Sequence, residues 1–153
     1  MTTYIDSSAL VPLYVTERFS DAADVAVTAA GGVPCTLIHR LELTNAFERL
    51  VGRRLLTRDE CRRLYEQLQD DLDTGRLMHV AIDWEGVIAQ AAELSRAHAA
   101  KFLSRSLDLL HVAAAQAMQC KTFVSADDRQ LAVAHAAGLK TVDIKRPARR
   151  KKT

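Results

Sequence analysis

The segment SLDLLHVAAAQAM, residues 106–118, places apolar side chains all round a helical wheel and yet contains one carboxylate. A helix of this composition is typical of a domain interior. There an ionised Asp108 is unfavourable unless a cation or a full set of hydrogen-bond donors compensates it. Two explanations are open: the free N–H groups of the first helical turn hold the carboxylate, or it shares a cation with carboxylates from elsewhere. His111 lies on the same face and would help to line such a site.

The composition favours one soluble domain. A chain of 153 residues can bury its own core, and it contains neither a long uncharged apolar run nor a signal-peptide pattern, so we expect a cytoplasmic protein without a membrane segment. The cysteines are odd in number and lack CxxC or CxxH spacing, which argues against disulfides and zinc. They are Cys35, Cys61 and Cys120.

The charge is distributed unevenly along the chain. The formal net charge is +2, but six basic residues fall within the last nine positions, and residues 1–144 contain 15 basic against 19 acidic residues. We expect one acidic domain over residues 1–144 and a basic, disordered tail over residues 145–153.

Short β-branched or apolar runs alternate with helical periodicity along the whole chain. This alternation predicts a mainly parallel sheet covered on both faces, a three-layer α/β/α domain of the α/β class. The expected strands are residues 2–6, 33–38, 77–82, 121–125 and 140–144. The expected helices begin at residue 7 and span residues 19–30, 39–55, 57–73, 84–98, 106–118 and 130–137.

Carboxylates follow two of these strands directly. Asp6 ends the first strand and Asp127 follows the fourth, so the two would be neighbours if these strands are adjacent where the winding of the sheet reverses. Asp6 is equally suited to be a helix N-cap. Glu42 borders the apolar stripe of its helix, where it either pairs with Arg49 or joins the other acids. Four acids in one cleft require cations or protonation, and all-oxygen ligands favour Mg²⁺ or Mn²⁺.

Four stretches together resemble a PIN domain, and more narrowly the VapC-type toxins of bacterial toxin-antitoxin pairs. They are TYIDSSALV near the start, LELTNAFERL, RSLDLLHVAAA, and FVSADDRQL followed by AAGLKTV. The resemblance covers residues 3 to about 144, with the acidic positions in the family's order. It implies a PIN-like fold and a Mg²⁺- or Mn²⁺-dependent endoribonuclease, the toxin of a type II toxin-antitoxin system. The catalytic metal ligands would be Asp6, Glu42, Asp108 and Asp127, supported by Ser7, Arg105, Ser125 and, in reserve, Asp128.

The expected chemistry is hydrolysis of an RNA phosphodiester by metal-activated water. GxSxG, Walker and HExxH motifs are absent from the sequence, so no other nucleophile is indicated. An acidic body repels RNA, and binding would depend on metal ions, on the tail and on a basic cluster. The cluster consists of Arg53, Arg54, Arg58, Arg62 and Arg63. The resemblance also implies a homodimer inhibited by a small cognate antitoxin protein.

A receiver-like phosphoacceptor domain is the alternative from another functional class. It would use Asp83, which follows the third strand, together with Ser125 and a lysine near the last strand. The adjacent pair of acids that such a domain has after its first strand is missing, and Asp108 would have no role. A third reading is a non-catalytic binding module, against which the presence of all four acids argues.

Overall fold

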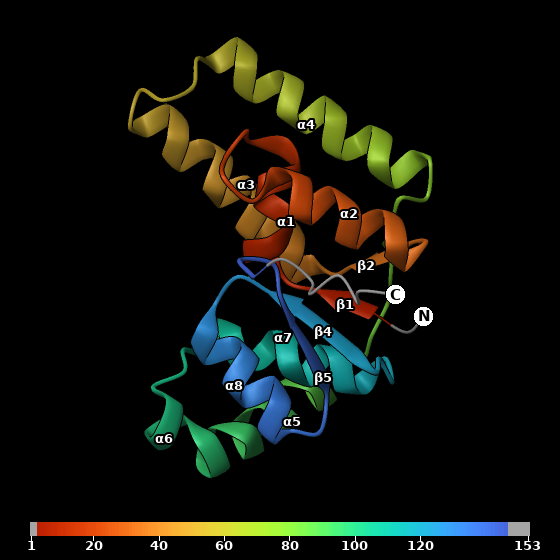
Figure 1. Cartoon of the computed structure of the whole chain (residues 1–153), viewed down its shortest axis with the longest axis vertical. Helices are drawn as coiled ribbons and strands as arrows, with labels where there is room; N and C mark the ends of the chain where they lie inside the picture. Colours follow the sequence, from red (N-terminus) through yellow and green to blue (C-terminus); the bar gives the residue numbers. More distant parts are fainter. Residues whose placement is uncertain (1–2, 147–153) are drawn as a thin grey trace, which may run out of the picture.

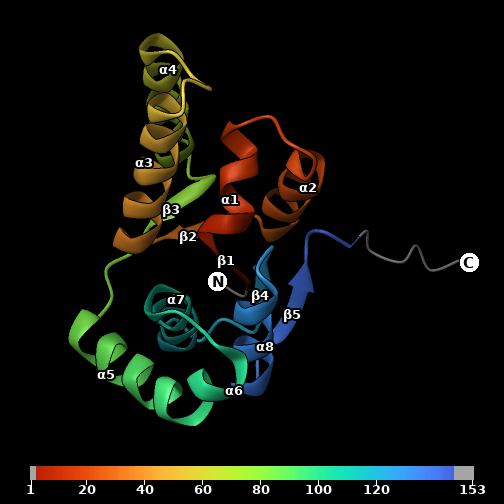
Figure 2. The same ribbon diagram turned by 90° about the vertical axis from the view of Figure 1, so that its left-hand side faces the viewer.

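The computed structural model describes residues 3–146, which form parallel β-strands with helices on both faces (Figures 1 and 2). The strands are β1 (Thr3–Ile5), β2 (Val33–Cys35), β3 (Leu77–His79), β4 (Thr122–Ser125) and β5 (Lys140–Asp143). One group of helices comprises α1 (Ser7–Tyr14), α2 (Ser20–Ala30), α3 (Leu37–Gly52) and α4 (Arg58–Asp73). The other comprises α5 (Trp84–Leu94), the π-helical turn η1 (Ser95–Ala99), α6 (Ala100–Phe102), α7 (Ser106–Ala117) and α8 (Asp128–Ala136).

The strand order explains how distant segments meet. β1, β4 and β5 are hydrogen-bonded in that order, β2 pairs with β3, and β2 lies beside β1, so that the order in space is 3-2-1-4-5. All the pairings are parallel. The predicted α/β class is therefore confirmed, and the adjacency of the first and fourth strands, on which a meeting of Asp6 and Asp127 depended, is present. The winding reverses between β1 and β4, and in open α/β sheets ligands bind at the carboxyl edge of such a point.

The two faces of the sheet have separate hydrophobic cores. Because side chains alternate along a strand, Ile5 and Val124 face the core made with α1 to α4. Tyr4 and Phe123, one position earlier, face the core made with α5, α7 and α8. All four side chains are almost fully buried. The strand ends are thus held between two packed layers, which fixes the residues that follow them.

Local signals in the sequence account for most helix boundaries. Gly31 ends α2 in the left-handed region at φ 66°, as the glycine pair predicted. Thr57 and Glu60 form the predicted capping box of α4. The second strand is shorter than predicted, because Thr36 caps α3 with His39 and the helix begins two residues early.

The central helix α7 is buried as predicted at residue 109 and from residue 111 to residue 115, but its first turn is not. Asp108 is half-buried, and Leu107 is 40% exposed. The expectation of a carboxylate in wholly apolar surroundings was therefore wrong, because the helix enters the core only after its first turn.

Three further expectations concern the ends, the cysteines and the membrane. The predicted tail lies outside the described residues from position 147 onward, while Lys145 and Arg146 pair with Asp128 and Asp143. The three cysteines are buried and free. Within residues 3–146, no helix has the length and apolar character that crossing a membrane requires.

Candidate active site

Asp6 lies at the carboxyl end of β1 and is the N-cap of α1. The backbone N–H of Ala9 donates to its Oδ1 at 3.2 Å, and the Ser8 hydroxyl lies 2.9 Å from both carboxylate oxygens. The side chain of Asp6 is only 3% exposed, and burial raises its pKa to about 6, although His111 and its hydrogen-bond donors act in the opposite direction. No Lys or Arg of residues 3–146 is paired with it. Asp6 is therefore a buried acid whose direct hydrogen-bond donors are uncharged.

Ser125, the last residue of β4, connects Asp6 to Asp127. Its hydroxyl lies 3.0 Å from Oδ2 of Asp6 and accepts a hydrogen bond from the backbone N–H of Asp127 at 2.9 Å. Asp127 caps α8 and is paired with Arg129 at 3.4 Å. Burial would raise the pKa of Asp127, but the side chain and backbone N–H of Arg129 and the N–H of Gln130 outweigh it and leave the pKa below its ordinary value.

Glu42 comes to the same edge from the second turn of α3. Its Oε2 lies 2.6 Å from Nε2 of His111 on α7, and the Ser7 hydroxyl lies 3.4 Å from that nitrogen. Burial would raise the pKa of Glu42, but hydrogen bonds from His111 and Ser7 and the charge of His111 outweigh it, so that the pKa is lowered. Glu42 is therefore paired with the buried His111, and not with Arg49 as the alternative from the sequence had it.

Asp108 is held by its own helix. Its Oδ2 accepts a hydrogen bond from the backbone N–H of Arg105 at 2.8 Å, which satisfies one free donor at the start of α7. This is the first of the two explanations given by the sequence. Asp128, the reserve residue, is exposed and paired with Lys145 at 2.7 Å.

A cavity of about 520 Å³ opens beside these residues. α1 contributes Ser7 and Ser8 to its wall, α3 contributes Glu42 and Arg49, and the approach to α7 contributes Arg105 among others. The wall therefore combines a carboxylate, hydroxyls, an amide and two guanidinium groups with the apolar side chains of Val11, Leu41, Ala46 and Leu107. Such a surface is chemically suited to a phosphate with a bound cation.

The structure brings some of the predicted acids closer together than others. Hydrogen bonds link Asp6 to Asp127 through Ser125, and Ser7, next to Asp6, approaches the His111 that binds Glu42. Asp108 has no hydrogen bond to this network among residues 3–146. Across that range, no three His, Cys, Asp or Glu side chains are gathered closely enough to hold an ion. The donors fit a hard divalent ion in chemical type, and their carboxylates would have to converge further to bind it.

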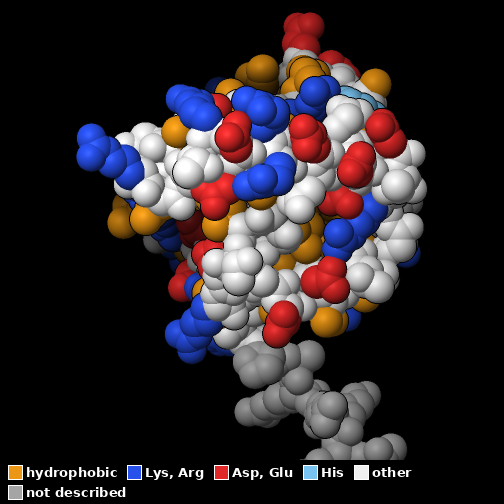
Figure 3. Space-filling view, turned by 90° about the horizontal axis from the view of Figure 1, so that it is seen from above, with side chains coloured by type: hydrophobic (Ala, Val, Ile, Leu, Met, Phe, Trp, Pro, Cys, Tyr) orange, Lys and Arg blue, Asp and Glu red, His pale blue; other side chains and the backbone are white. Residues whose placement is uncertain are grey.

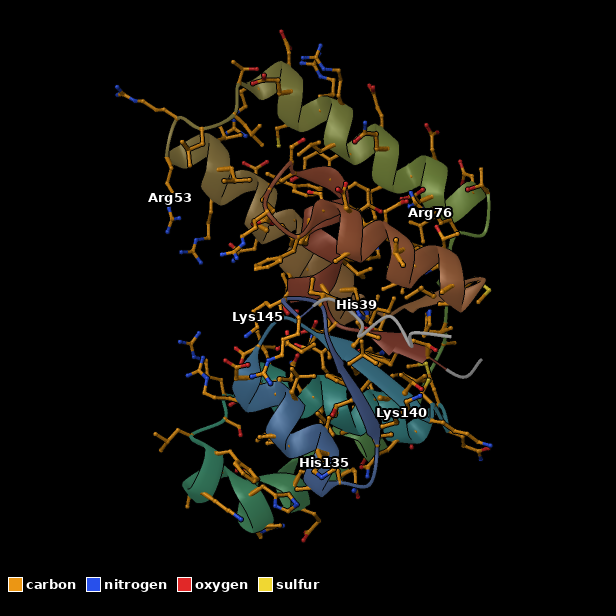
Figure 4. All side chains as sticks on the ribbon, in the orientation of Figure 1. His39, Arg53, Arg76, His135, Lys140 and Lys145 are labelled. Carbon is orange, nitrogen blue, oxygen red and sulfur yellow. The ribbon has the colours of Figure 1, made fainter. Side chains whose placement is uncertain are left out.

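The predicted basic cluster is divided by the fold. Arg58 and Arg62 are paired with Glu48 and Asp59. Figure 3 shows acidic and basic side chains interleaved over the face that carries α4, rather than one basic patch. Arg53 instead extends from the end of α3 (Figure 4) and, with Arg49, lines a second cavity of about 290 Å³ between α1 and α3. Arg49 belongs to both cavities.

Four residues of the site were missed by the sequence analysis. Ser8 binds Asp6, and its hydroxyl accepts the N–H of Ala126 at 3.0 Å. The other three are the buried Tyr4, His39 and Gln130, which contact His111, the backbone of Ile5 and Ser125. Only Ser8 had a local signal, a hydroxyl two residues after a strand-end acid.

Comparison with known proteins decides the family. The sequence model of the PIN domain matches residues 3–136. The chain belongs to the PIN domain family. The crystal structure of FitAcB from Neisseria gonorrhoeae superposes on this PIN domain with a TM-score of 0.68 at 16% identity, covering 94% of this chain and 99% of the other. PAE2754 from Pyrobaculum aerophilum gives a TM-score of 0.58 at 16% identity, covering 95% and 90%. A search of curated proteins finds no match.

Membership of this family places the chain in a superfamily of nucleases, which generally use divalent metal ions. The receiver alternative finds no support in the structure. Asp83 is exposed at the start of α5, and the preceding strand β3 pairs with β2, away from the edge that β1 and β4 form.

Proposed function

We propose that this PIN domain is a Mg²⁺- or Mn²⁺-dependent endoribonuclease, the toxin of a type II toxin-antitoxin pair. The observation that carries the proposal is Asp6, a buried carboxylate with uncharged direct donors at the reversal point of the sheet. Taking an ionised carboxylate out of water costs several kcal/mol by general experience, and a bound cation would offset that cost. Asp127 is joined to it through Ser125, and Glu42 binds the His111 that Ser7, the neighbour of Asp6 in the chain, approaches.

Asp6, Glu42, Asp108 and Asp127 are the proposed metal ligands. A divalent ion supplies Lewis-acid chemistry when bound: it makes water nucleophilic at neutral pH and neutralises charge on the phosphate. The chain's own part is to orient the carboxylates, through Ser8 and Ser125 for Asp6 and through His111 for Glu42. Asp108 would have to exchange its capping bond with Arg105 for the ion.

The arginines supply the proposed contact with RNA. Arg49 and Arg105 stand in the wall of the main cavity, and Arg49 and Arg53 continue along α3 into the second cavity. Arg49 and Arg53 are one helical turn apart, about 6 Å along the axis of α3. Guanidinium groups bind phosphate in a bidentate manner, so this row is suited to follow a strand that leaves the acids. Binding of this kind weakens as salt rises.

A cleavage assay tests the proposal. The purified chain is incubated with total cellular RNA and Mn²⁺, Mg²⁺ or excess EDTA, and the fragments are separated on a gel. We expect cleavage with either ion, none with EDTA, and a loss of about 100-fold or more in Asp6→Asn and Glu42→Gln. Asp83→Asn is the control, because Asp83 also stands at the N-cap position of a helix after a strand, although its side chain accepts no capping hydrogen bond. Full activity in Asp6→Asn with loss in Asp83→Asn would remove the proposed site.

The same assay tests the contact with RNA. Arg49→Ala should raise KM at low salt with little effect on kcat, because it removes a binding contact. Arg62→Ala is the control, since Arg62 is an exposed arginine paired with Asp59. Equal effects of the two substitutions would assign RNA binding to general charge.

The proposed partners are a small cognate antitoxin and a second copy of the chain, by resemblance to VapC-type toxins. Co-purification with the product of an adjacent small reading frame, and sedimentation of the chain alone, test these two points. A monomer that remains fully active when that product is in excess would contradict both.

A further inference from the structure

Tyr4, His111 and Glu42 form a chain of hydrogen bonds that joins three elements. Nδ1 of His111 lies 2.7 Å from the Tyr4 hydroxyl, and Nε2 lies 2.6 Å from Oε2 of Glu42. Tyr4 comes from β1, His111 from α7 and Glu42 from α3. The tyrosine is fully buried and the histidine is 1% exposed, whereas the side chain of Glu42 is 27% exposed. This series of hydrogen bonds therefore leads from the core to the wall of the main cavity.

The direction of these bonds follows from the chemistry of the groups. An ionised carboxylate only accepts, so Nε2 of His111 donates to Glu42. When the imidazole is neutral, Nδ1 is then an acceptor and the Tyr4 hydroxyl donates to it; when the imidazole is charged, Nδ1 donates to the Tyr4 oxygen. The ring of Tyr4 is itself fixed, because it stacks on Phe123 with 5.5 Å between ring centroids and 8° between planes. Each group in the chain thus fixes the orientation of the next.

The other buried histidine at this edge differs in its contacts. His39 accepts the backbone N–H of Thr36 at 3.1 Å, and its Nε2 lies 2.9 Å from the carbonyl oxygen of Ile5. It lies where α3 meets β1, as Figure 4 shows, and so ties the start of the helix to the end of the strand. His111 instead hydrogen-bonds to the carboxylate of Glu42, which reaches the cavity. A purely structural link between elements does not require such a partner.

We propose that His111, oriented by Tyr4, is a positioning residue that holds the Glu42 carboxylate ready for the metal ion. The proposal rests on the proposed function, because it assigns Glu42 to the ion. A glutamate has three rotatable side-chain bonds, and a partner that fixes them removes an entropy loss from the binding step. Hydrogen-bond partners of metal-ligating groups generally change metal affinity or activity about 10- to 100-fold when mutated.

Binding of Mn²⁺ to the purified chain, measured by titration calorimetry, tests the proposal without reference to RNA. We expect His111→Leu to weaken Mn²⁺ binding about 10-fold or more, and Tyr4→Phe to weaken it in the same direction. His111→Gln should keep the affinity within about 3-fold of wild type, because its amide N–H can replace Nε2 as the donor. In the cleavage assay the first two variants should need more Mn²⁺ for half-maximal rate.

Tyr14→Phe is the matched control. The Tyr14 hydroxyl also donates a hydrogen bond of 2.7 Å, to Asp71 on α4, and Tyr14 is also buried. Loss of that hydroxyl should lower stability without changing Mn²⁺ affinity. A merely structural role for Tyr4 would make the two tyrosine variants behave alike.

The outcomes separate this proposal from the proposed function. If Glu42→Gln loses Mn²⁺ binding while His111→Leu and Tyr4→Phe keep it, the positioning role is overturned and the nuclease proposal stands. If Glu42→Gln also binds Mn²⁺ and cleaves RNA as wild type does, the assignment of Glu42 itself fails. Should His111→Leu not fold, the comparison of Tyr4→Phe with Tyr14→Phe decides.

Discussion

The turns after β1 and β4 have the same local design and different environments. In each, an aspartate follows a buried strand and caps the next helix, Asp6 for α1 and Asp127 for α8. Asp6 is 3% exposed and its pKa is raised to about 6 by burial. Asp127 has a side chain 29% exposed and an arginine partner, and its pKa is lowered. Capping therefore accounts for the position of both residues, but only for Asp6 does burial make the ionised carboxylate unfavourable.

This difference separates a requirement of the fold from a requirement of function. A serine or asparagine caps a helix as well as an aspartate does. The fold alone therefore gives no reason for a buried carboxylate at Asp6. Residues that reduce stability where a neutral substitute would serve are typical of functional sites. Asp127, by contrast, is compatible with either role.

Asp6→Asn gives the largest expected effect on stability and has the opposite sign from most substitutions. The folded-state pKa of about 6 lies above the ordinary aspartate value of 3.8, so folding favours the protonated acid. The contribution of Asp6 to stability is thus most favourable below about pH 4 and is lost as pH rises through 6. In EDTA at pH 8, Asp6→Asn should be more stable than the wild type by about 1 to 3 kcal/mol. The upper limit follows from the pKa shift of Asp6, at about 1.4 kcal/mol per pKa unit.

Urea unfolding at pH 4 and pH 8 measures this change. The gain should disappear at pH 4, where the wild-type carboxyl is protonated, and Mn²⁺ at pH 8 should reduce it by stabilising the wild type. Asp83→Asn, at an exposed cap, is the control and should change little at either pH. A gain of equal size at both pH values would mean that the charge of Asp6 is not its cause.

Periodic patterns in the sequence predicted the strands, the helices and the places of Asp6 and Asp127, because these depend on neighbours along the chain. The first turn of α7 was misjudged, since the wheel of residues 106–118 does not tell where the helix enters the core. Tyr4 and His111 are 107 positions apart, and no local pattern marks such a contact. The capping box of α3 was also missed, because its third residue is His39 rather than glutamate or glutamine.

Ser125→Ala should have an intermediate effect, and it acts on both turns at once. The hydroxyl binds Asp6 and accepts the N–H of Asp127. Its removal leaves that partly buried N–H without its acceptor, so we expect a loss of about 1 to 2 kcal/mol in unfolding free energy. Ser104→Ala is the control, because the buried Ser104 hydroxyl has no hydrogen-bond partner among the described residues. If the two serine variants lose the same stability, the bridge between the turns is of little consequence.

Arg129→Ala should have the smallest effect and should act on one turn alone. Asp127 has a lowered pKa, so its ion pair contributes stability that is present above the unfolded-state pKa and is lost as pH falls through the folded-state value. Both partners are partly exposed, with side chains 39% and 29% accessible, and solvent screening limits the loss to about 0.5 kcal/mol at neutral pH. Carboxyl ¹³C titration by NMR should show the pKa of Asp127 rising in this variant while that of Asp6 stays in place, because Arg129 donates nothing to Asp6. A joint shift of both carboxyls would mean that the two turns titrate as one site, and the contrast between them would then belong to the pair rather than to each residue.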